Sequence, residues 1–128
     1  MDVEALNAAV IGGLRTDRDA CLGAIRRTME FVDVLSRDGS ADPASAVDEA
    51  VYAQDLYLRV LLAVDYLRET GRFRFTALDA MDRRSPLLIY ARALGAAADG
   101  DRSGLAVTIL QTLKNMVDAL EAVTATAG

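Results

Sequence analysis

Apolar residues recur at spacings of three and four along nearly the whole chain, and this helical period narrows the possible folds most. The clearest stripes predict one amphipathic helix over 16–37 and another over 103–123. Turn signals separate every such segment, so we expect an all-α protein. The two stripes consist of Leu22, Ile25, Met29, Val32 and Leu35, and of Ile109, Leu113, Met116 or Val117, Leu120 and Val123.

A long helix is predicted between these two, from Pro43 to about Thr70. Asp42 is a suitable N-cap, and proline at the first helical position loses no hydrogen bond. Gly71 ends the segment. The middle of this helix, residues 56–64, is apolar on nearly all sides. Such a helix must be covered on every side, either by neighbouring helices or by another chain.

The sequence predicts a separate, short helix over residues 2–14 at the N-terminus. Gly12 and Gly13 weaken it, because a glycine inside a helix costs about 1 kcal/mol relative to alanine. Thr16 then offers an N-cap for the next helix. We therefore expect residues 1–15 to be a mobile segment, and the tail 124–128 to be frayed.

The region after the long helix is less regular. Residues 72–75 alternate between arginine and phenylalanine, but no nearby segment could pair with them as a strand. A short helix is predicted over 76–84, and Ser85-Pro86 restarts a helix that runs to about Ala98. Asp99-Gly100-Asp101 predicts a turn.

Short connections make consecutive helices antiparallel neighbours. The predicted fold is an up-and-down antiparallel helical bundle with four main helices and a short N-terminal helix. At 128 residues the chain forms a single domain over 1–128.

The composition argues against an enzyme. The chain has no histidine and one cysteine, Cys21, so the commonest general base and the usual metal ligands are missing. Cys21 lies beside a core-facing stripe, where we expect a buried, inert thiol. We predict no catalytic residue, no cofactor and no metal.

Charge and hydropathy limit the partners and the location. The net charge of −5 argues against nucleic acid, whose binders need a basic face. The longest aliphatic run, Val60 to Val64, is far too short to span a membrane. The N-terminus lacks the charged and then apolar order of a signal peptide. We therefore expect a cytoplasmic protein without membrane insertion.

Carboxylates are the only plentiful reactive groups. Asp55 and Asp65 fall in the apolar middle of the long helix, where a carboxylate is costly unless it is paired or hydrated. Arg59 follows Asp55 by four residues and is its expected partner. Structural pairing is the favoured interpretation of these residues, ahead of catalysis.

Four short motifs occur in order along the chain. Gly-Ala-Ile-Arg begins at Gly23, Ala-Gln-Asp at Ala53, Val-Asp-Tyr at Val64 and Leu-Asp-Ala at Leu78. This order resembles that of the flagellar secretion chaperones of the FliS family, which tend to have Leu-Asp-Phe where this chain has Val-Asp-Tyr. The similarity runs collinearly over about residues 16–123.

The chain also departs from the pattern of that family. Ala20-Cys21-Leu22 stands where the family has Leu-Tyr-Asp, and Ser85-Pro86 interrupts a stretch that is continuous there. The tyrosine-bearing N-terminal segment and the tryptophan of the last helix are missing. The resemblance therefore implies a divergent relative.

The resemblance implies a small helical chaperone that binds newly made flagellin. Such a chaperone covers the apolar faces of disordered terminal segments by docking them as amphipathic helices into its own grooves. We therefore expect a flagellin-like helical segment, from the flagellin C-terminal region, as the protein partner.

Two other functions stay open at this point. One is a homodimer that buries the same apolar surface against a second copy, as a structural or regulatory protein. The other is an enzyme or ligand sensor built on carboxylates and tyrosines. The residues predicted to contact a partner are Ile25, Met29, Leu56, Val60, Leu61, Val64, Ile109 and Leu113.

Overall fold

The computed structural model describes residues 2–38, 41–69, 73–75, 87–97, 99–122 and 125–127. Within these ranges the chain forms helices α1 (Val3–Arg37), α2 (Ala44–Glu69), α3 (Leu87–Ala96) and α4 (Asp99–Ala122), and strands β1 (Phe73–Phe75) and β2 (Ala125–Ala127). The helix predicted over 76–84 and the restart at Ser85-Pro86 lie outside the described residues.

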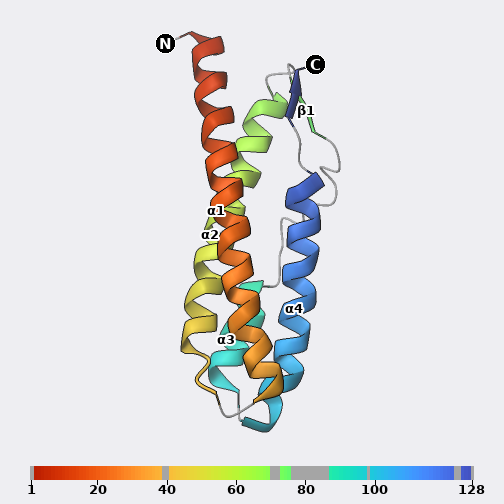
Figure 1. Cartoon of the computed structure of the whole chain (residues 1–128). Coiled ribbons are helices and arrows are strands. Elements are labelled where there is room, and N and C mark those ends of the chain that lie inside the picture. Colours follow the sequence, from red (N-terminus) through yellow and green to blue (C-terminus); the bar gives the residue numbers. More distant parts are fainter. Residues whose placement is uncertain are drawn as a thin grey trace.

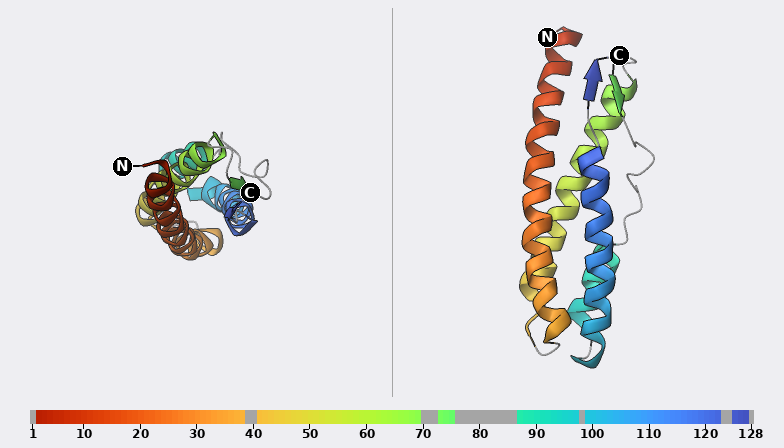
Figure 2. Two further views of the ribbon diagram at one scale, coloured as in Figure 1. Left: turned by 90° about the horizontal axis from the view of Figure 1, so that it is seen from above. Right: turned by 45° about the vertical axis from the view of Figure 1, so that its right-hand side comes forward.

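The four helices pack as an antiparallel bundle (Figure 1). α1 packs against α2 and α4, and α3 packs against the same two helices from the other side. Viewed from above, α1, α2 and α4 surround the bundle axis, and α3 lies below the upper part of α2 (Figure 2). The predicted all-α, up-and-down bundle is confirmed.

The first helix is continuous, so the prediction of a separate N-terminal helix is wrong. α1 runs for 35 residues and passes through Gly12 and Gly13 without a break. Asp2 caps its start by accepting a hydrogen bond from the Ala5 amide at 2.7 Å. The Thr16 hydroxyl, which we expected to cap a new helix, donates instead to the Gly12 carbonyl at 3.0 Å. Helix on both sides of the glycines, with Leu14 buried, outweighs their unfavourable propensity.

The later helix boundaries follow the local signals more closely. α2 begins at Ala44, whose amide donates to the Asp42 carboxylate at 3.0 Å, and it ends at Glu69 as expected. α3 also matches its prediction. α4 begins at Asp99 rather than Ser103, so the residues predicted to form a turn belong to its first helical turn.

A short strand pair corrects a further prediction. β1 pairs antiparallel with β2, with Phe73 opposite Ala127 and Phe75 opposite Ala125. Residues 73–75 therefore have a strand partner, which residues 125–127 supply. The sequence pattern missed the pairing because the two segments are far apart along the chain. They meet because α2 and α4 end on the same side of the bundle (Figure 1).

The core lies between the helices and receives apolar side chains from all four. Thr28 is also buried, and its hydroxyl donates to the Ala24 carbonyl at 2.8 Å within the same helix. The largest fully buried side chains are Tyr57, Ile25, Leu35, Leu67, Leu87, Leu94, Ile109, Leu113, Leu120, Val32, Val60 and Val64.

Alanine at Gly12 or Gly13 should stabilise the protein. Apart from adjacent residues and the nearby backbone of α1 itself, a Cβ at either position meets nothing within 4 Å, so the substitution adds helix propensity without a clash. We expect each change to raise the free energy of unfolding by about 0.5–1 kcal/mol, measured by urea denaturation.

Gly104→Ala is the matched control, because Gly104 lies inside α4 and has equally open surroundings. If alanine raises the free energy of unfolding at Gly104 but lowers it at Gly12 and Gly13, the helix is interrupted at the glycine pair.

Candidate partner-binding groove between α1 and α4

Most of the residues predicted to contact a partner lie in the core. Seven of the eight are at most 6% exposed, and they belong to the one core cluster to which all four helices contribute. Met29 is the exception, since it is half-buried. Of the eight predicted residues, a partner can reach only Met29 while the bundle is closed. Contact with the other seven would require the helices to separate. The seven are Ile25, Leu56, Val60, Leu61, Val64, Ile109 and Leu113.

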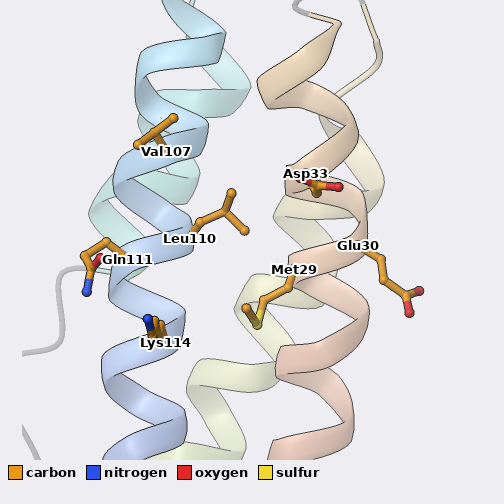
Figure 3. Close-up of a pocket in the computed structure, with 7 residues that line it drawn as sticks. All are labelled: Met29, Glu30, Asp33, Val107, Leu110, Gln111 and Lys114. Carbon is orange, nitrogen blue, oxygen red and sulfur yellow. The ribbon is translucent and has the colours of Figure 1, made fainter.

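An open groove lies between α1 and α4. It has a volume of about 540 Å³, and its apolar lining comes from Met29 on α1 and from Val107 and Leu110 on α4. Figure 3 shows Leu110 directed toward α1 and Met29 directed toward α4. Val107 is 60% exposed, so the groove presents apolar surface to solvent.

The two edges of the groove carry different charges. Glu30 and Asp33 lie on the α1 edge, and Gln111 and Lys114 lie on the α4 edge (Figure 3). Asp33 forms an ion pair with Arg37 one turn further along α1. Lys114 is the only lysine in the chain. Neither Glu30 nor Lys114 forms an ion pair within the described ranges, so both charges are open to a partner.

Arginine side chains tie α4 to other segments on either side of the groove. Toward the chain termini, the Arg18 side chain donates from Nε to the Leu120 carbonyl at 2.7 Å and joins α1 to α4. That carbonyl lies in the last turn of α4, where it has no helical partner of its own. Near the start of α4, Arg102 donates to the Ala41 carbonyl at 3.2 Å. These bonds fix the position of α4 relative to the first two helices.

Sequence reasoning missed Val107 and Leu110. Together with Lys114 they recur at spacings of three and four, beside the core stripe that contains Ile109 and Leu113. This second apolar stripe could have indicated the groove from the sequence. The stronger stripe of a helix marks its core-facing side, and the groove lies beside that side.

The outer surface of α2 is also partly uncovered. Val51, Leu58 and Leu62, here called the α2 stripe, are 47, 41 and 68% exposed. The stripe continues from Val47, which contacts α3: a Val47 methyl lies 3.6 Å from where a Cβ on Gly95 would be. The described helices therefore do not cover α2 on every side.

The expected pairing of Asp55 with Arg59 is confirmed, but its setting differs. The two groups are 3.1 Å apart, and each side chain is more than half exposed. Asp55 therefore lies on the surface of α2 rather than in an apolar environment. An exposed pair of this kind contributes little, about 0.3–0.5 kcal/mol.

Cys21 is fully buried between α1 and α2, and its thiol donates to the Ala53 carbonyl at 3.4 Å. Burial, and secondarily the charge of Asp17, raises its pKa from 9.0 to about 12. The thiol therefore stays protonated at neutral pH and is a poor nucleophile.

No group of three or more carboxylate or thiol side chains in the described ranges is placed to hold a metal ion. Among the same residues, no helix is long and apolar enough to cross a membrane.

The fold thus places the chain among antiparallel four-helix bundles with an open apolar groove between two helices. Comparison with known proteins finds no match to a family model, to a curated protein or to a solved structure. The resemblance to flagellar secretion chaperones therefore depends on the sequence motifs alone.

The raised pKa of Cys21 predicts a pH-dependent stability. Because its pKa is higher in the folded protein than in the unfolded chain, the neutral thiol stabilises the fold fully below pH 9. This contribution is lost as the pH rises toward about 12.

Urea denaturation between pH 8 and 11 should therefore show a steeper loss of stability for the wild type than for Cys21→Ala. If the free energy of unfolding falls equally with pH in both proteins, the raised pKa of Cys21 is contradicted.

Proposed function

We propose that this protein is a cytoplasmic export chaperone or adaptor that binds an amphipathic helical segment of another protein. The observation that carries the proposal is the groove between α1 and α4, whose lining is apolar and open to solvent. The amides and carbonyls of its helical walls are already used within the helices. A partner must therefore satisfy its own backbone, which an amphipathic helix does.

The size of the groove favours weak, reversible binding. The residues of α4 that line it run from Val107 to Lys114 and span about 10 Å, or about two turns of a partner helix. So short a contact buries less area than a standard protein interface. A disordered client also loses conformational entropy when it folds on binding, which weakens the complex further. Reversible binding suits a chaperone that must release its client.

Flagellin is the proposed client, on the strength of the resemblance to the FliS family. Its C-terminal region carries apolar faces that drive polymerisation. Covering them before export would prevent premature assembly. This function needs neither catalysis nor a cofactor.

Titration with a flagellin C-terminal peptide tests the proposal by calorimetry. We expect heat of binding for the wild-type protein and at least a tenfold loss of affinity for Val107→Asp, because a charge would enter the apolar lining. Val107 is exposed, so this change should leave stability within about 0.5 kcal/mol. Val60→Asp is unsuitable, because Val60 is fully buried and its replacement would unfold the bundle.

Ile89→Asp is the matched control. Ile89 is 70% exposed and belongs to α3, outside the groove. If the wild type, Val107→Asp and Ile89→Asp bind the peptide with equal affinity, the groove is not the binding site. If the wild type gives no heat of binding, flagellin is not the client.

A second candidate function is a homodimeric structural or regulatory protein. The α2 stripe favours it, because these exposed aliphatic side chains follow one face of a helix and could pack against a second copy.

Sedimentation equilibrium tests this second function. If α2 forms a dimer interface, the wild-type protein should sediment as a dimer, and Leu62→Asp should shift it to a monomer at the same concentration. A wild-type monomer up to about 100 μM would exclude a stable dimer, since its dissociation constant would then exceed that value.

A further inference from the structure

The charges beside the groove constrain the chemistry of its occupant more narrowly than an apolar stripe alone. Within the described part of the chain, Glu30 gives the α1 edge an unpaired negative charge, since Asp33 is already paired with Arg37. Lys114, by contrast, makes the α4 edge basic. A helix lying over Met29, Val107 and Leu110 must place one flank beside each edge. This inference rests on the function proposed above, since it concerns the partner of the same groove.

We propose that the partner helix carries basic residues on one flank of its apolar stripe and acidic residues on the other. A basic flank would meet Glu30, which forms no ion pair among the described residues. An acidic flank would meet Lys114 across the groove. A helix with two like-charged flanks would place one flank against an edge of its own sign.

The unlike edges also set the direction of the bound helix. When an amphipathic helix is turned end to end over the same groove, its two flanks exchange edges. A helix with unlike flanks therefore matches both edges in one direction only. A helix with like flanks has no such preference. The groove consequently selects both the charge pattern of the partner and the end of the groove at which it starts.

Three synthetic peptides of 18 residues test the inference, with leucine at helical spacing in each. The first carries lysine on one flank and glutamate on the other, the second has glutamate on both flanks, and the third has lysine on both. We expect the first to bind wild-type protein about threefold more tightly than either of the others, as is usual for exposed charge pairs. The difference should vanish at 1 M NaCl.

Charge reversal on the protein provides the complementary test. Glu30→Lys should make the peptide with two glutamate flanks the tightest binder. Asp48→Lys is the matched control, because Asp48 is exposed on α2, away from the groove, and the change alters net charge equally. It should preserve the wild-type order of affinities.

Direction is read from a nitroxide at the N-terminus of the first peptide. It should broaden amide signals at only one end of α4. Equal broadening at both ends would overturn the directional part of the inference.

The remaining outcomes separate the inference from the proposed function. If Val107→Asp abolishes binding of every peptide but the peptides bind equally and Glu30→Lys changes nothing, the charge inference is wrong and the groove still binds helices. If none of the peptides binds, both fail. If the protein alone dimerises and Val107→Asp makes it monomeric, a second copy occupies the groove and the inference is overturned.

Discussion

The close approach of α1 to α2 determines where the bundle is filled and where it is open. Cys21 on α1 is fully buried, as is Ala53 on α2, and the Cys21 sulfur lies 3.4 Å from the Ala53 carbonyl oxygen. α1 therefore packs more extensively on α2 than on α4. On the other side, the longer Met29 and Leu110 line a gap that they do not fill. The groove is a consequence of this unequal packing.

Helix type and most helix boundaries could be predicted from the sequence because their signals are local. The Asp42 cap and the period of apolar residues act within a few positions, and they located α2 to within about a residue. The predictions failed where distant segments decide the outcome. The pairing of β1 with β2 joins the segments that follow α2 and α4. Gly12 and Gly13 remain helical because the whole of α1 supports them.

The candidate site was harder to predict than the fold, for a different physical reason. Hydrophobicity identifies side chains that avoid water, but it does not distinguish a core from a binding surface. Val60 and Ile109 belong to the strongest apolar segments and are fully buried. Val107 has a similar side chain and is largely exposed, because it lies on a different side of α4 from the buried stripe that contains Ile109. Only the packing of α1 against α4 reveals the difference.

The groove and the α2 stripe belong to different helix pairs. The groove is formed by α1 and α4, whereas the α2 stripe continues from the contact between α2 and α3. Association through α2 would leave the groove accessible, so the two candidate functions are compatible in one molecule.

The scarcity of lysine has a practical consequence. Apart from the N-terminal amine, Lys114 supplies the only primary amine in the chain, and it stands at the edge of the groove. Amine-reactive fluorophores or photo-crosslinkers that spare the terminus would therefore attach at this one position. A crosslinker attached at Lys114 could therefore capture a partner bound beside α4 without any change to the sequence.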